Sequence, residues 1–286
     1  MDHYKPMRAG QFGEHAQRAA RAYGAAADHY TRPQLGVWDR FGAATVARLD
    51  LSAGAHVLDL CCGARASAIP AAHAVGETGR VTGVDVAEPL LAMARSRASA
   101  EGLANIEFRC ADAGQTGLPT GAFDAVVCVF GVFFAPDMAA FTREMWRLVR
   151  PGGMLAVTVW GPGLFEPANT VFWAGVRDVE PALFKAFNPW DEITAPEALA
   201  ALFTMAGVPG VAAEPQAGEH RLDRPDDVWD VVLGSGYRAT VDALSADQRD
   251  SLRDRVVGEL RARAVATIRT DVIYAIARRP VAGARR

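Results

Sequence analysis

The sequence lacks the features that mark membrane, secreted and nucleic-acid-binding proteins. No apolar run reaches the roughly 18 residues of a membrane span, and the N-terminus has no apolar signal core. The formal net charge is only −3, without the clustered basic face that is typical of nucleic-acid binding. We therefore expect a cytoplasmic protein that acts on neither membranes nor nucleic acids.

Cysteine is also scarce, with four residues and no C-x-x-C pair among them. Cys61, Cys62, Cys110 and Cys128 all fall at or inside predicted core strands, which is typical of small buried hydrophobic side chains. A zinc site would need more ligands at fixed spacing. The sequence thus predicts no metal site.

What is present is an alternation of apolar strands and helices. Half of the 286 residues are hydrophobic and the mean hydropathy is close to zero, so the chain can bury one large α/β core, with or without a cap. Continuous apolar runs of this kind favour a parallel sheet that is covered on both faces. We expect strands near 56–61, 80–85, 106–110, 123–129, 154–160 and 270–276, and helices near 66–75, 88–101 and 137–149.

The rest of the chain is less regular. We expect helices over 16–27 and 35–49, and two further helices that begin at the capping boxes Thr194–Glu197 and Ser245–Gln248. The predicted domains are a helical cap at 1–50, a cofactor-binding core at 51–160, a substrate cap at 161–240 and a C-terminal helix and strand at 241–286.

The most informative stretch is Val57-Leu58-Asp59-Leu60-Cys61-Cys62-Gly63-Ala64. It predicts a buried strand, a tight turn of small residues and a helix that starts near Ala66. This order lets backbone N–H groups and a helix N-terminus approach a nucleotide-sized ligand. Asp59 lies at the strand's carboxyl end. Asp85 closes the next strand, where a carboxylate can accept both hydroxyls of a ribose.

Further motifs follow in order: Cys110-Ala111-Asp112-Ala113, Phe123-Asp124-Ala125-Val126-Val127 and Leu148-Val149-Arg150-Pro151-Gly152-Gly153-Met154-Leu155. The series resembles class I S-adenosylmethionine-dependent methyltransferases of the small-molecule (ubiquinone and menaquinone methyltransferase-like) group, closely over about residues 35 to 160. The resemblance implies an α/β, Rossmann-like doubly wound fold. Its sheet would be seven-stranded and mostly parallel, with an antiparallel last strand and a helical cap. The implied cofactor is S-adenosyl-L-methionine, with S-adenosyl-L-homocysteine as product.

The first motif of this family usually reads V-L-D-x-G-x-G-x-G. By resemblance, Asp59 helps to hold the methionine amino group, often through water, and the turn of Cys61, Cys62 and Gly63 lies against the methionine moiety. Asp85 matches the acid that holds the ribose.

The resemblance also assigns the adenine contacts. Val86 and Leu90 flank the ring, Asp112 accepts a hydrogen bond from the adenine amino group, and the backbone N–H of Ala113 binds the ring. The remaining implied contacts are Phe130, which follows the fourth core strand, and the N-terminal Tyr23 and Tyr30.

A simpler interpretation holds for each acid alone, because an aspartate at a strand end most often caps a helix. Three aspartates at successive strand ends in the family's order favour the methyltransferase fold. A dinucleotide dehydrogenase would carry G-x-G-x-x-G after its strand, whereas this turn has one glycine and an aspartate before it.

The turn departs from the family pattern at two positions. Cys61 replaces the first glycine and Arg65 replaces the third. Three interpretations stay open for Arg65: it points to solvent, it pairs with a carboxylate of the cofactor or substrate, or it marks a damaged or repurposed site.

Acceptor and base are less clearly marked. Aromatic residues between 161 and 240, Trp190 among them, suit a pocket for a flat, apolar acceptor. Five of them could instead form the cap's own core: Phe165, Phe172, Trp173, Phe184 and Phe187. His29 and His220 are the candidate catalytic bases, with a surface location as the alternative for His29. His15 is expected on a helix surface.

The sequence therefore predicts transfer of a methyl group to a small, hydrophobic or aromatic metabolite, with oxygen favoured over nitrogen or carbon. Two alternatives stay open. The same fold could bind the cofactor and catalyse a cyclisation, rearrangement or decarboxylation, or the chain could be a degenerate cofactor-binding protein. The only expected partner is the small-molecule substrate, and both a monomer and a homodimer are compatible with the sequence.

Overall fold

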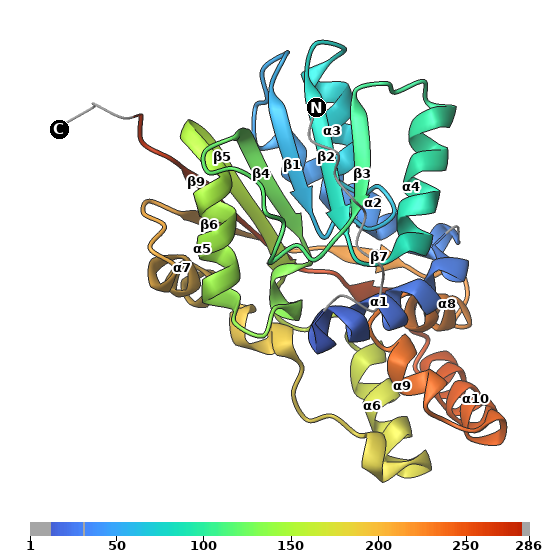
Figure 1. The fold of residues 1–286 in the computed structure, drawn as a ribbon. Helices are drawn as coiled ribbons and strands as arrows, with labels where there is room; N and C mark the ends of the chain where they lie inside the picture. The colour runs from blue at the N-terminus through green and yellow to red at the C-terminus, as the bar shows by residue number, and fades with distance from the viewer. Residues whose placement is uncertain (1–12, 31, 282–286) are drawn as a thin grey trace.

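The fold is built on one seven-stranded sheet with the order β3-β2-β1-β4-β5-β9-β6 (Figure 1). The structure is a computed structural model that describes residues 13–30 and 32–281. Only β9 runs antiparallel, between β5 and β6, so the predicted mostly parallel sheet is confirmed. The strands are β1 (His56–Leu60), β2 (Arg80–Asp85), β3 (Ile106–Cys110), β4 (Phe123–Val129), β5 (Val149–Trp160), β6 (Ala212–Gln216) and β9 (Val272–Arg278).

Helices cover both faces of this sheet, as the continuous apolar strands predict. One core packs α2 (Gly36–Ala47), α3 (Ala68–Val75) and α4 (Glu88–Ala100) against one face. The other face is covered by α5 (Met138–Leu148) and α7 (Pro196–Met205). The strands β1, β2 and β4 end at one edge of the sheet and point toward α1 (Glu14–Ala26) (Figure 1).

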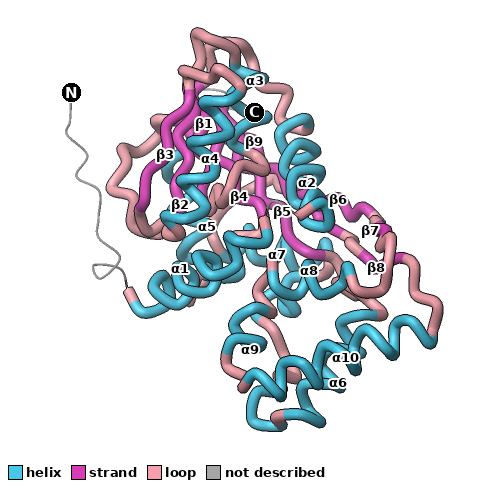
Figure 2. Tube along the Cα trace, turned by 90° about the vertical axis from the view of Figure 1, so that its right-hand side faces the viewer, coloured by secondary structure: helices cyan, strands magenta, loops and turns pink. Residues whose placement is uncertain are grey.

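Beyond this edge lies a second layer that is mostly helical. Figure 2 shows α6 and α10 side by side below the sheet, with the small two-stranded sheet of β7 and β8 next to them. Its members are α6 (Ala168–Val179), β7 (Glu219–Arg221), α8 (Asp227–Leu233), α9 (Arg238–Asp242), α10 (Ala246–Ala262) and β8 (Thr267–Arg269). The 3-10 helices are η2 (Ala27–His29), η3 (Pro33–Leu35), η4 (Val132–Phe134), η5 (Pro181–Leu183) and η6 (Pro189–Ile193).

One of the two predicted capping boxes is wrong. Ser245 and Gln248 cap α10 reciprocally, as predicted. At α7, however, the N-cap is Ala195 without a side-chain hydrogen bond, because Thr194 is the C-cap of η6 and its hydroxyl donates to the Asp191 carbonyl at 3.4 Å. The domain boundaries near 50, 160 and 240 stay predictions.

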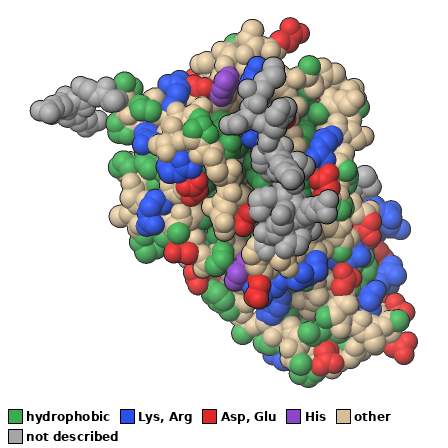
Figure 3. Space-filling view, viewed as in Figure 1, with side chains coloured by type: hydrophobic (Ala, Val, Ile, Leu, Met, Phe, Trp, Pro, Cys, Tyr) green, Lys and Arg blue, Asp and Glu red, His purple; other side chains and the backbone are tan. Residues whose placement is uncertain are grey.

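Acidic and basic side chains are interspersed on the face that Figure 3 shows, in keeping with the small net charge. Within the described residues, no helix combines the length and the apolar character that crossing a bilayer requires.

Candidate functional site

A cavity of about 490 Å³ lies at the carboxyl ends of β1, β2 and β4, below α1. Its wall combines α1 and α2, the turn after β1, the ends of β2 and β4, the loop after β3, and residues of the second layer. This is the crevice where open α/β sheets bind ligands. Its size is in the range of small-molecule sites, which is about 300–1,000 Å³.

The turn after β1 and the end of β2 are held together by Asp85. The Gly63 N–H donates to Asp85 Oδ2 at 2.9 Å, and the Ala87 N–H donates to Oδ1 at 2.8 Å. Burial raises the pKa of Asp85, and the hydrogen bonds from these backbone N–H groups offset part of that rise. The carboxylate is thus fixed in position while it lines the cavity.

The turn itself is unusually tight. Both Cys61 and Gly63 have a positive φ, 58° and 55° respectively, a conformation that favours glycine. A side chain at Gly131, just after β4, would bring a Cβ within 2.5 Å of the Cys61 Cβ. The absence of a side chain at Gly131 therefore lets the end of β4 pass directly beside Cys61.

A second polar position follows β3. Asp112 lines the cavity, and its Oδ1 accepts the Gly114 N–H at 2.9 Å. Leu90 on α4 also lines the cavity, and Tyr23 and Tyr30 pack against the small apolar cluster to which it belongs. Burial raises the pKa of both tyrosines, so both hydroxyls are protonated at neutral pH.

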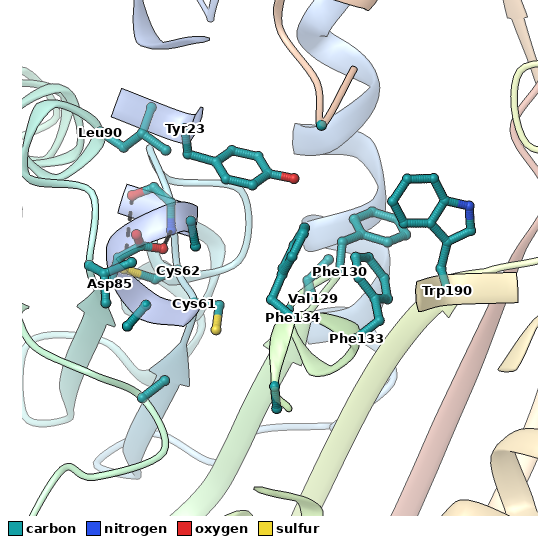
Figure 4. A pocket seen from close by; sticks show the side chains of 18 of the residues that line it. Tyr23, Cys61, Cys62, Asp85, Leu90, Val129, Phe130, Phe133, Phe134 and Trp190 are labelled. Atoms are coloured by element: carbon teal, nitrogen blue, oxygen red, sulfur yellow. Dashed lines mark hydrogen bonds between the residues drawn. The ribbon is translucent and has the colours of Figure 1, made fainter. Parts of the chain in front are cut away.

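The cavity brings together all but one of the residues that the sequence assigns to the cofactor. The lining residues among them are Tyr23, Tyr30, Cys61, Cys62, Gly63, Asp85, Val86, Leu90, Asp112, Ala113 and Phe130. Figure 4 shows Asp85, Cys62 and Leu90 on one side of the cavity, with the Tyr23 ring reaching across it.

Asp59 is the exception. It is 1% exposed and is not among the cavity-lining residues; instead the lining residue Ser67 donates to its Oδ2 at 2.7 Å. Its Oδ1 is buried without a hydrogen-bond partner within the described chain. Burial raises the pKa of Asp59 to about 7; the hydrogen bond from Ser67 opposes this and the nearby Asp85 adds to it.

The opposite side of the cavity is aromatic. Figure 4 shows Phe130, Phe133, Phe134 and Trp190 facing the Tyr23 ring. The rings of Tyr23 and Phe134 meet edge to face with centroids 5.3 Å apart, and those of Phe133 and Trp190 lie 5.7 Å apart. Tyr23 comes from α1, Phe133 and Phe134 from η4, and Trp190 from η6. The sequence did not predict that these three elements lie together.

The cap aromatics divide between the two predicted roles. Phe165 lines the cavity, whereas Phe172 and Trp173 are buried in the second layer away from it. Phe184 packs at the edge of that core, and Phe187 is 54% exposed.

Arg65 does not simply point to solvent, because its side chain is only 23% exposed and pairs with Asp39; the other two interpretations of Arg65 stay predictions. Its Nε donates to both oxygens of Asp39 at 2.9 and 3.1 Å, and its Nη2 donates to Oδ2 at 2.7 Å. Asp39 belongs to α2, and both residues line the cavity. The guanidinium is therefore held at the site by an acid that the sequence analysis did not single out.

The structure brings neither candidate base to the cavity. The His29 Nδ1 lies 2.6 Å from the Asp28 carboxylate and 3.4 Å from Arg238, outside the cavity lining. His220 lies on β7, where burial lowers its pKa and its Nε2 has no hydrogen-bond partner within the described chain. Instead, His15 on α1 lines the cavity although it is exposed, because α1 crosses the mouth.

Comparisons with known proteins agree with this geometry. Residues 57–153 match the family model of the methyltransferase domain. The chain is 31% identical over 189 residues to the nocamycin O-methyltransferase of Saccharothrix syringae, an alignment that covers 66% of this chain and 61% of that protein. It is 34% identical over 143 residues to the demethylmenaquinone methyltransferase of Listeria monocytogenes serotype 4a (strain HCC23), covering 50% and 60%.

The chain thus spans about three fifths of the length of these two curated relatives. A crystal structure of an S-adenosylmethionine-dependent methyltransferase from Aquifex aeolicus superposes with a TM-score of 0.51 at 20% identity, covering 66% of this chain and 89% of that one. This likeness establishes the shared fold.

Proposed function

We propose that this chain, which belongs to the class I S-adenosylmethionine-dependent methyltransferases, transfers the methyl group of that cofactor to an oxygen atom of a small, hydrophobic or aromatic acceptor. One observation carries the proposal: a single cavity joins acidic strand ends to a wall of aromatic rings. The acidic side suits an adenosyl group, and the aromatic side suits a flat acceptor.

The residues on the acidic side fit the cofactor. Both oxygens of the Asp85 carboxylate accept backbone N–H groups, and the carboxylate keeps acceptor capacity for the ribose hydroxyls. Asp112 offers a carboxylate to the adenine amino group, while Val86 and Leu90 offer apolar contacts to the faces of the ring. Bound there, the cofactor supplies a methyl group that is already electrophilic.

The contribution of the protein is then mainly orientation and exclusion of water. The rings of Phe133, Phe134 and Trp190 would hold a flat acceptor against the cofactor side of the cavity. The Tyr23 ring closes the cavity from above (Figure 4). The preference for oxygen draws support from the relative that is named an O-methyltransferase.

A hydroxyl acceptor also gains from a base. Among the described residues that line the cavity, His15 is the only histidine, so we assign it to accept the proton of the acceptor hydroxyl. A His15→Gln variant is expected to lower kcat with a phenol acceptor about 100-fold at neutral pH. The loss should shrink as the pH approaches the pKa of the phenol, because a phenolate needs no base; a constant loss across that range contradicts the assignment.

The experiment that tests the proposal is incubation with methyl-labelled S-adenosylmethionine and a panel of phenols, naphthohydroquinones and matched anilines. We expect labelled ethers and an equal amount of S-adenosylhomocysteine from the hydroxyl acceptors. Asp85→Asn should reduce this activity strongly, and the matched change Asp250→Asn, at an exposed residue of α10, should not.

Other outcomes contradict the proposal in separate ways. Label on nitrogen or carbon contradicts the oxygen preference alone. Turnover of an acceptor without label transfer favours a non-methylating reaction, and cofactor binding without turnover of any acceptor favours a degenerate protein.

A further inference from the structure

Arg65 stands where the family pattern has glycine, and it forms an ion pair inside the cavity wall. The guanidinium and its partner Asp39 are only partly exposed, with 23% and 38% of their side-chain surface accessible. We propose that the Arg65–Asp39 pair binds the amino-acid end of the cofactor, its carboxylate on Arg65 and its ammonium on Asp39. This inference rests on the proposed function.

The pair is fixed in place by the fold rather than by flexible side chains. Helix α2 passes so close to the turn that a Cβ at Gly42 would lie 2.0 Å from the Ala66 carbonyl oxygen. Asp39 lies three residues before Gly42, on the same face of the helix. The absence of a side chain at Gly42 therefore lets α2 bring Asp39 to Arg65.

Both members keep hydrogen-bonding capacity for a ligand. The guanidinium has five N–H donors, and its contacts with Asp39 involve only Nε and Nη2. Within the described chain, Arg65 Nη1 has no partner, and the Asp39 carboxylate accepts only from Arg65. Nη1 can therefore donate to a carboxylate while the free lone pairs of Asp39 accept from an ammonium group, which together match an amino-acid zwitterion.

The charges of the cavity leave few other sites for that zwitterion. Among the described lining residues, Arg65 is the only arginine or lysine. Asp59, to which the resemblance assigns the ammonium group, does not line the cavity, and its carboxyl group is half protonated near neutral pH because burial raises its pKa to about 7.

The position of the pair also fits the path of the ligand. Asp85, which accepts the Gly63 N–H, is the proposed binding site of the ribose. Arg65 lies two residues after Gly63, in the turn that leads to α3. A cofactor with its ribose on Asp85 can therefore extend its amino-acid end along the turn to Arg65 and Asp39.

Calorimetric titration with two ligands tests the inference. S-adenosylhomocysteine carries the amino-acid end, and 5′-methylthioadenosine has the same nucleoside and thioether without it. Arg65→Met keeps the aliphatic stem and removes the donors. We expect Arg65→Met to weaken S-adenosylhomocysteine binding about tenfold or more, since the loss of a hydrogen bond to a charged group typically lowers affinity by that factor. The affinity for 5′-methylthioadenosine should stay within about twofold, because this ligand lacks the amino-acid end.

Two more variants complete the test. Arg65→Lys keeps the charge but not the planar fork, so it should recover part of the affinity. Arg263→Met removes a matched arginine, paired with Glu259 on α10 outside the cavity, and should change neither affinity.

The results separate the inference from the proposed function. If Arg65→Met lowers the affinity for both ligands equally, or lowers neither, the zwitterion site is overturned while the nucleoside site stands. Retained binding of 5′-methylthioadenosine also shows that the variant is folded. If the unaltered chain binds neither ligand, the proposed function fails, and this inference fails with it.

Discussion

Replacing Asp59 by asparagine should make the stability of this protein less dependent on pH. Asp59 is 1% exposed, and one carboxylate oxygen has no hydrogen-bond partner within the described chain. Burial therefore raises its pKa from 3.8 to about 7, with Ser67 opposing the shift and Asp85 adding to it. A raised pKa means that the folded state prefers the protonated carboxyl group.

The sign and size of the effect follow from this shift. Because the folded state binds the proton more tightly than the unfolded state, the stability that protonated Asp59 provides is complete below pH 4 and is lost as the pH rises to about 7. Two pH units of this window lie between pH 5 and pH 7, and each corresponds to about 1.4 kcal/mol. The slope flattens near pH 7, where the folded-state carboxyl group is half ionised, so the free energy of unfolding of the unaltered protein should fall by about 2 kcal/mol relative to Asp59→Asn over that range.

Urea unfolding followed by tryptophan fluorescence at pH 5, 6, 7 and 8 measures the difference. Asp124→Asn is the matched control. Burial alone would raise the pKa of Asp124, but the His56 N–H and Arg150 lower it below its usual value, so its effect on stability should be constant above pH 5. Parallel stability curves for Asp59→Asn and the unaltered protein would refute the reasoning, because they would mean that Asp59 is solvated and ionised.

Two further predictions concern the walls of the cavity. Gly42→Ala should lower the free energy of unfolding in urea by about 1–3 kcal/mol, because the added Cβ would collide with the Ala66 carbonyl. The control Gly258→Ala on α10, where the added Cβ meets open space, should not lower it. Equal effects of the two variants would contradict the close approach of α2 to the turn. Trp190→Ala should raise KM for an aromatic acceptor about tenfold and leave S-adenosylhomocysteine affinity unchanged. The control Phe187→Ala, at an exposed residue outside the cavity lining, should change neither value. An unchanged KM in Trp190→Ala would show that Trp190 does not contact the acceptor.

The sequence predicts the central strands of the sheet well because both faces of these strands are largely buried. The strand β4 is therefore a mostly apolar run and appears as Phe123–Val129, with the bounds that this run predicts, whereas the edge strand β3 carries Glu107 and Arg109 and has no fully buried residue. The strand β6 escapes this signal. Its residues 212–216 are mostly exposed and include Pro215, which an edge strand tolerates because it pairs on one side only.

The acidic side of the cavity is also predictable, since strand ends are fixed in chain order. Asp85 ends β2, Asp112 follows β3, and both line the cavity. Asp59 shows the limit of the pattern, because a strand end fixes the location of a residue but not the direction of its side chain.

The remaining parts of the site depend on long-range packing. Asp39 carries no local signal for its pairing with Arg65, 26 positions later, because that pairing requires α2 to cross the turn. The position of His15 is similar: helical periodicity marks it as a surface residue, but only the tertiary structure shows that this surface borders a cavity. Trp190 comes from a short 3-10 helix with no periodicity to read.

A crystal structure with S-adenosylhomocysteine bound tests the central claim most directly, namely that the cavity at the carboxyl ends of β1, β2 and β4 is the cofactor site. The account predicts ribose hydroxyls within hydrogen-bond distance of Asp85, the amino-acid end at Arg65 and Asp39, and the sulfur facing the aromatic wall. A ligand bound elsewhere on the protein, or bound in this cavity in the reverse direction, would contradict it.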